Sequence, residues 1–95
     1  MEIKVEGEQK GDRYECRVTV VEGASSTEHR VTVEKNYRDR IAGPEVPMEQ
    51  LVRKSFEFLL AREAKESILP QFELPLINRY FPEYERKIKV RVAKK

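Results

Sequence analysis

The spacing of apolar residues changes near residue 47, and this change constrains the fold more than any other feature of the sequence. Before that point, apolar residues recur at every second position, as in a β-strand with one buried face. After it, they recur at every third or fourth position, as in an amphipathic helix. The chain therefore predicts an α+β fold, in which a three- or four-stranded antiparallel sheet is packed on one face by a long helix and short C-terminal helices.

The alternating half, residues 1–35, predicts strands that pair as an antiparallel meander. Val, Ile and Thr, which favour strands, recur in this half. Turn-forming residues at 7–12 and 23–26 separate the strands. The residues predicted to face inward are Ile3, Val5, Tyr14, Cys16, Val18, Val20, His29, Val31 and Val33.

The register of the second and third strands follows from the turn between them. If this turn is centred between Ala24 and Ser25, Val18 lies opposite Val31, and the apolar residues of both strands face the same side. A slip by one residue would move one whole apolar set to the other face, so the hydrophobic pattern favours such a pairing.

A long amphipathic helix is predicted over residues 47–63, and Pro47 suits its first turn. In the connection that precedes it, Tyr37 and Ile41 predict one helical turn that docks on the core. The apolar stripe of the long helix is formed by Met48, Leu51, Val52, Phe56, Leu59 and Leu60.

The C-terminal part of the chain has a less regular pattern. Its prolines predict short helical segments rather than one long helix. These segments are expected to fill the edge of the core with Leu69, Phe72, Leu74, Ile77 and Phe81. A DNA-reading helix-turn-helix is the alternative for residues 67–85, but its second helix would be too short and would carry few outward polar residues.

Residues 86–95 are open to two interpretations. As an edge strand, they would turn Ile88, Val90 and Val92 inward and their basic residues outward. As a helix, they would align Ile88 and Val92 with Tyr84 and leave Val90 outside the line. Because the alternation is complete and valine favours strands, we expect a fourth strand.

The overall composition places the chain as one domain, 1–95, divided into strands (1–35), a helical layer (47–85) and a basic tail or edge strand (86–95). Its 95 residues carry a net charge of +2, from 19 Lys and Arg against 17 Asp and Glu. This near balance generates no strong overall field for DNA or anionic lipid. With a single cysteine and no signal peptide or membrane-spanning run, the sequence predicts a cytoplasmic location.

No catalytic, metal or cofactor site is predicted. Cys16 and His29 lie four residues apart along neighbouring strands in the expected register, too far for a nucleophile and its base. A zinc site needs several Cys or His ligands, and the chain has one of each. Its four glycines are scattered, so no phosphate-binding loop is formed. We therefore expect a protein that is not an enzyme and takes no cofactor.

Two surfaces remain as candidate binding sites. The aromatic cluster Tyr80, Pro82 and Tyr84 predicts a contact with a protein partner or with a second copy of the chain, because aromatic residues are enriched at interface centres. The alternative is weak, sequence-independent contact with nucleic acid phosphates through the basic tail. The tail residues concerned are Lys87, Lys89, Arg91, Lys94 and Lys95.

The segment SFEFLLAREAKESILPQFELPLINRYFPEYE, residues 55–85, resembles the C-terminal part of a family of small prokaryotic proteins of unknown function. In that family a short β-rich part precedes a helical segment with the pattern FLL, RE, KESIL and YFPEYE. The resemblance covers about a third of the chain. It implies kinship but no activity, so it assigns no functional residue.

Overall fold

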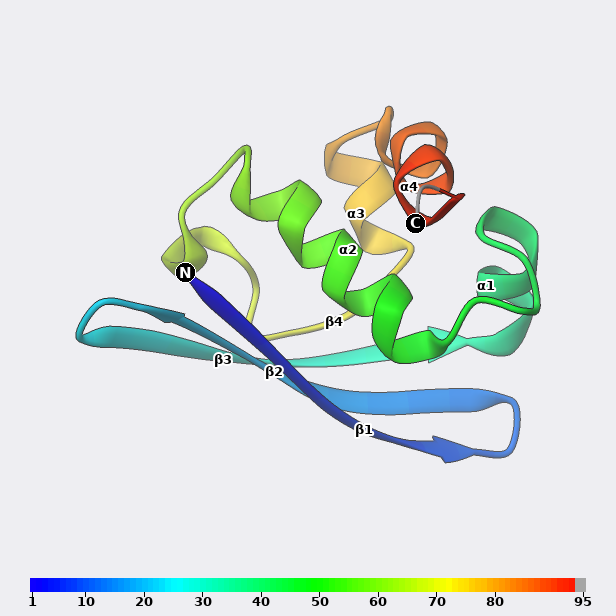
Figure 1. Cartoon of the computed structure of the whole chain (residues 1–95), viewed down its shortest axis with the longest axis horizontal. Helices are drawn as coiled ribbons and strands as arrows, with labels where there is room; N and C mark the ends of the chain where they lie inside the picture. Colours follow the sequence, from blue (N-terminus) through cyan, green and yellow to red (C-terminus); the bar gives the residue numbers. More distant parts are fainter. Residues whose placement is uncertain (94–95) are drawn as a thin grey trace.

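The computed structural model describes residues 1–93, which form a four-stranded sheet with helices on one of its faces (Figure 1). The strand order is β1-β2-β3-β4. The first three strands are antiparallel, and β4 runs parallel to β3. The elements are β1 Glu2–Lys10, β2 Arg13–Glu22, β3 Ser25–Glu34, α1 Lys35–Ile41, α2 Met48–Leu60, the 3-10 turn η1 Lys65–Ser67, β4 Gln71–Glu73, α3 Leu76–Tyr80 and α4 Tyr84–Ala93. The predicted α+β class is confirmed.

The meander of β1, β2 and β3 is built on two-residue turns. Gly11 and Gly23 open these turns with φ values of 62° and 60°, which glycine adopts without steric cost. The predicted turn at 7–12 is therefore too long, since β1 continues to Lys10. The predicted faces are correct, but the β2–β3 register is wrong by two residues.

Val18 lies opposite His29 rather than Val31. The reason is that the turn is centred between Gly23 and Ala24, where glycine supplies the positive φ. A shift of two residues keeps every side chain on its face, so the hydrophobic pattern alone does not distinguish the two registers.

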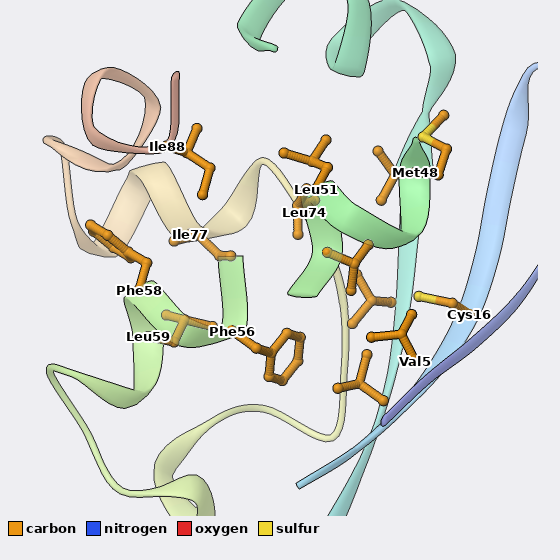
Figure 2. Close-up of a cluster of buried hydrophobic side chains, with 14 of the residues drawn as sticks. Val5, Cys16, Met48, Leu51, Phe56, Phe58, Leu59, Leu74, Ile77 and Ile88 are labelled. Carbon is orange, nitrogen blue, oxygen red and sulfur yellow. The ribbon is translucent and has the colours of Figure 1, made fainter. Parts of the chain in front are cut away.

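Helix α2 covers the inner face of the sheet, as its apolar stripe predicts (Figure 2). It ends at Leu60, three residues before the predicted end. The guanidinium of Arg62 donates to the carbonyl of Phe58 at 3.0 Å, which satisfies one of the free carbonyls at the helix end. The core that α2 shares with the sheet and the other helices includes Val5, Cys16, Leu51, Phe56, Leu74, Ile77 and Ile88.

The predicted fourth strand at 86–95 is wrong, because residues 84–93 form helix α4. Tyr84, Ile88 and Val92 are buried along one side of this helix, whereas Val90 is 54% exposed. The helix is favoured because it lets Tyr84 pack against α2 side chains 26–29 residues earlier in the chain. Local strand propensity does not take such a long-range contact into account. The fourth strand is β4, which adds three residues beside β3 in a parallel pairing.

The helical turn predicted at Tyr37 and Ile41 is confirmed as α1, with both side chains buried. On the uncovered face of the sheet, charged side chains form cross-strand ion pairs. The Arg17 guanidinium, for example, lies 3.3 Å from Glu6 and 3.2 Å from Glu28. Within residues 1–93, no helix has both the length and the apolar character needed to cross a membrane.

Candidate binding cleft

An apolar cleft of about 410 Å³ opens between the end of α2, the η1 segment, β4 and α3. This volume is within the range of small-molecule and side-chain binding pockets. Most of its lining is apolar, and Glu63 and Ser67 are its polar residues. The apolar side chains that shape it most are Leu59, Leu69, Phe72, Ile77, Tyr80 and Phe81.

The wall of the cleft that contains Leu69 is held against β3 by hydrogen bonds. His29 Nδ1–H donates to the carbonyl of Leu69 at 2.8 Å. The amide of Arg30 donates to the carbonyl of Pro70, also at 2.8 Å. Because proline has no amide hydrogen, this short segment can join the sheet only through its carbonyl at that position. The position of Leu69 in the cleft therefore depends on β3.

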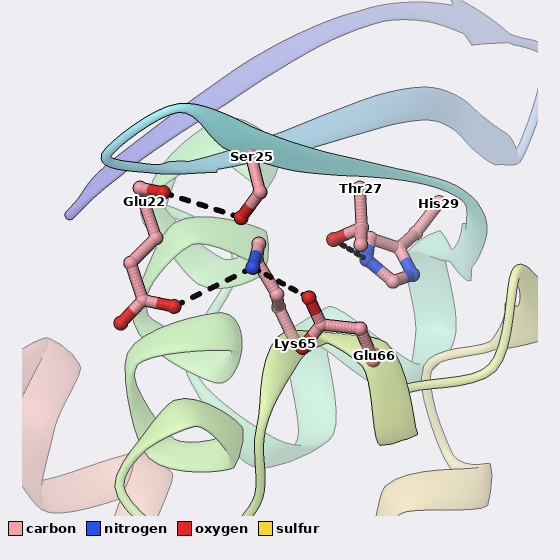
Figure 3. A network of polar contacts seen from close by, with 6 residues as sticks. All are labelled: Glu22, Ser25, Thr27, His29, Lys65 and Glu66. Carbon is pink, nitrogen blue, oxygen red and sulfur yellow. Dashed lines mark hydrogen bonds and ion pairs between the residues drawn. The ribbon is translucent and has the colours of Figure 1, made fainter.

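His29 is a buried part of this arrangement, with 2% of its surface exposed, which confirms its predicted inward orientation. Its Nε2 lies 2.8 Å from the hydroxyl of Thr27 (Figure 3). Its ring lies 5.4 Å from the ring of Phe56, between centroids. Both imidazole nitrogens have partners, so the side chain joins β3, α2 and the cleft wall.

Lys65 fixes the η1 side of the cleft. Its ammonium group lies 2.6 Å from Glu66 and 3.5 Å from Glu22 at the end of β2 (Figure 3). The side chain is 3% exposed. The hydrogen bond with Glu66 raises the pKa of Lys65, so the amine stays charged at neutral pH. A buried lysine with two carboxylates ties the turn to the sheet.

Glu63 is the one carboxylate in the cleft lining. Burial raises the pKa of its carboxyl above the ordinary value. Among residues 1–93, no side chain forms an ion pair or a hydrogen bond with the Glu63 carboxylate. The cleft thus combines apolar walls with one uncompensated negative charge.

The aromatic residues predicted to bind a partner are separated by the structure. Tyr80 is 66% exposed and lines the cleft. Pro82 is exposed on the turn that follows and does not line it. Tyr84 is fully buried, and its hydroxyl lies 2.6 Å from Ser55 Oγ, so it offers no binding surface. The sequence next to such an aromatic residue does not indicate whether its side chain faces the core or the surface.

The basic residues of the alternative site lie on a helix instead of a strand. Lys87 and Lys89 are exposed on α4, and Arg91 is half-buried. Lys94 and Lys95 lie outside the described residues. A helix distributes these charges around its axis, so they do not form the single row that a strand would present.

Cys16 and His29 lie closer together than predicted, because the corrected register places Cys16 opposite Val31, two residues from His29. They still form no nucleophile and base pair, since the nitrogens of His29 bond to Thr27 and Leu69. Burial raises the pKa of the Cys16 thiol to about 12, which keeps it protonated at neutral pH. In the part of the chain that the structure describes, no three His, Cys, Asp or Glu side chains are grouped so as to hold a metal ion.

Sequence reasoning missed most of the cleft because it assigned Leu69 to the edge of the core, whereas this side chain is 43% exposed. The same assignment is confirmed for Leu74 and Ile77, which are buried, and for Phe72 and Phe81, which are half-buried and pack against the core. One available signal was the pair of prolines, Pro70 and Pro75, which disfavour helical backbone at the residues before them, Leu69 and Leu74.

Comparisons with family models, with curated proteins and with solved structures found no match to this chain. The resemblance of residues 55–85 to small prokaryotic proteins stays a prediction.

Proposed function

We propose that this chain is a small non-catalytic protein-interaction domain, and that the cleft receives an apolar side chain of the partner. The proposal rests on the location of the exposed apolar side chains. Four large apolar side chains are exposed among residues 1–93, and two of them, Leu69 and Tyr80, line the cleft. Exposed apolar groups around a concave site are typical of binding surfaces.

A non-catalytic role is supported by the chemistry of the reactive side chains. The thiol of Cys16 is buried and protonated, and His29 is engaged by two hydrogen bonds. The polar groups of the cleft, Glu63 and Ser67, do not form a hydrogen bond with each other in the structure. A binding site is therefore better supported here than an active site.

Selection from a random peptide library displayed on phage tests the proposal. We expect binding peptides to shift the amide NMR signals of Leu69, Phe72 and Tyr80 in the isotope-labelled chain. Tyr80→Ala and Leu69→Ser should each weaken binding by at least tenfold. The matched control is Val90→Ser, which changes an exposed apolar residue on α4, away from the cleft.

The proposal fails if the selected peptides bind Tyr80→Ala and Leu69→Ser as well as they bind the original chain. It also fails if the selection yields no binder. In either case the exposed apolar residues of the cleft have no role in recognition.

A second candidate function is contact with nucleic acid through α4. It is favoured by Arg86, Lys87 and Lys89, which are exposed and form no ion pair within residues 1–93. Binding of a fluorescent single-stranded oligonucleotide would then weaken as salt rises, because phosphate contacts release counterions. If Lys87→Glu with Lys89→Glu leaves low-salt binding unchanged, or if no binding occurs at low salt, this alternative is excluded.

A further inference from the structure

The carboxylate of Glu63 is left without a cation although two cationic residues are its near neighbours in sequence. Arg62 lies one residue before it and Lys65 two residues after it. In the structure both of these side chains interact elsewhere. Glu63 is half-exposed in the cleft lining, and burial raises the pKa of its carboxyl. A cation placed beside it would stabilise its charged form.

Arg62 is held by the C-terminal segment. Its guanidinium lies 3.3 Å from the carboxylate of Glu83 and stacks over the ring of Phe58, 3.6 Å from the ring centroid. It also donates to the carbonyl of Phe58. An ion pair, a cation–π contact and a backbone hydrogen bond together keep this guanidinium with Phe58 and Glu83.

Lys65 is held by the sheet. Its buried ammonium group lies between Glu66 and Glu22 (Figure 3), and withdrawing it would leave both carboxylates unpaired. The two cations nearest to Glu63 in sequence are thus engaged elsewhere. The carboxylate is left open to a cationic group of a ligand that enters the cleft.

We propose that the cleft recognises a segment of a partner protein in which a large apolar side chain lies beside a lysine or arginine, with Glu63 as the counter-ion of that cation. This inference rests on the proposed function and adds the chemistry of the partner. The apolar body would fill the space between Leu69, Phe72 and Tyr80. Long basic side chains suit such a site, because their methylene groups pack on apolar surface while the charged end reaches a carboxylate.

The charge preference can be tested with three probes of one shape: 4-phenylbutylamine, 4-phenylbutanol and 4-phenylbutyrate. Each presents the same phenyl group, followed by a cation, a neutral hydroxyl or an anion. In NMR titrations of the full chain at pH 7, we expect each probe that binds to shift the amide signals of Leu69, Phe72 and Tyr80. The amine should bind tightest and the carboxylate weakest.

Glu63→Gln should remove the preference for the amine, lowering its affinity by about fivefold, the effect of a partly exposed ion pair. The affinity of the alcohol should stay the same. The matched control is Glu73→Gln, which removes the same charge one residue from Phe72, at an exposed position that does not line the cleft. Its amine affinity should stay within twofold of the original chain.

The outcomes separate the inference from the proposed function. If the amine and the alcohol bind the cleft equally, and Glu63→Gln changes neither, the role of Glu63 is wrong and the apolar cleft remains. If Glu73→Gln lowers amine affinity as much as Glu63→Gln, the effect is general electrostatics and the inference is likewise overturned. If no probe perturbs the cleft residues and no displayed peptide binds there, both proposals are wrong.

Discussion

Helix α2 is covered in two different ways along its length. In its middle, Ser55 and Phe58 meet α4, and the contact is closed. Ser55 donates to the carbonyl of Leu51 at 2.7 Å and accepts from the hydroxyl of Tyr84 at 2.6 Å. The ring of Phe58 lies 5.2 Å from that of Tyr84 and is fully buried. We call this contact the sealed seam.

At the end of α2 the cover is incomplete. Leu59 faces the cleft, and the carboxylate of Glu63, just beyond the helix, has no partner within residues 1–93. The seam satisfies every polar group it buries, whereas the cleft leaves one charge and two large apolar side chains accessible. The comparison shows that one helix is closed over by packing at one place and borders an open apolar cleft at another.

The largest expected effect is on the seam. Phe58→Ala should lower the free energy of unfolding by about 3–5 kcal/mol, because it removes a fully buried ring and leaves a cavity. The matched truncation in the cleft, Leu69→Ala, should change it by less than about 1 kcal/mol, since that side chain is 43% exposed. Urea denaturation of both variants measures the two values. Equal losses would mean that the cleft is part of the core.

The second expected effect concerns the link between sheet and cleft. His29→Ala should lower the free energy of unfolding by about 1–3 kcal/mol, because it leaves the Leu69 carbonyl without its donor. It should also weaken peptide binding, since the cleft wall loses its attachment to β3. His29→Asn keeps a donor near the position of Nδ1 and should retain more binding. If His29→Ala reduces stability but leaves peptide binding unchanged, the wall is held by the backbone hydrogen bonds of β3 to Pro70 and β4.

The hydrogen bond that closes the seam should have a smaller effect. Tyr84→Phe should lower the free energy of unfolding by about 0.5–1.5 kcal/mol, because the ring stays buried and one hydrogen bond to Ser55 is lost. Ser55 keeps its bond to Leu51, so no buried donor is left unpaired. Thermal unfolding provides the measurement, and peptide binding should not change. A loss of binding would show that the seam and the cleft are coupled.

The parts of this molecule that sequence could predict are those whose pattern is local. The alternating residues of β2 and β3 identified the buried face correctly, and the stripe of α2 identified its buried side. Face assignment depends only on periods of two and of about 3.6 residues. The register was missed because Gly23 and Ala24 both lie in a turn-forming segment, and only the backbone angle at Gly23 distinguishes the two turns.

The C-terminal helix and the cleft depend on contacts between distant residues. The spacing of Ile88 and Val92 fits both a strand and a helix. The helix forms because it allows Tyr84 to be buried against α2. Leu69 is as apolar as a core residue, so composition gave no reason to expect it at a surface. Its position follows from β3, 40 residues earlier in the chain, through His29.

The smallest expected effect compares two nearby carboxylates with opposite environments. Burial raises the pKa of Glu63, whereas the hydrogen bond from Lys65 lowers the pKa of Glu66. The folded chain therefore holds the Glu63 proton more tightly than the unfolded chain, in which its pKa is the ordinary 4.5. As pH rises from 4.5 through the higher folded pKa, the Glu63 contribution to stability falls and then stays low. For Glu66 the sign is reversed, because its contribution is present above the ordinary pKa and is lost as pH falls through the lower folded value.

Glu63→Gln should consequently raise the free energy of unfolding at pH 7 relative to its effect at pH 3.5, by no more than about 0.5 kcal/mol, and the melting temperature with it. Glu66→Gln should lower the melting temperature at pH 7, because it leaves the buried Lys65 with Glu22 alone. Adding 4-phenylbutylamine should reduce the advantage of Glu63→Gln, since the amine binds more tightly to, and so stabilises more, the chain that keeps the carboxylate. If both variants change stability in the same direction, the charge of Glu63 is already compensated within the fold, and the contrast between a sealed seam and an open, charged cleft is lost.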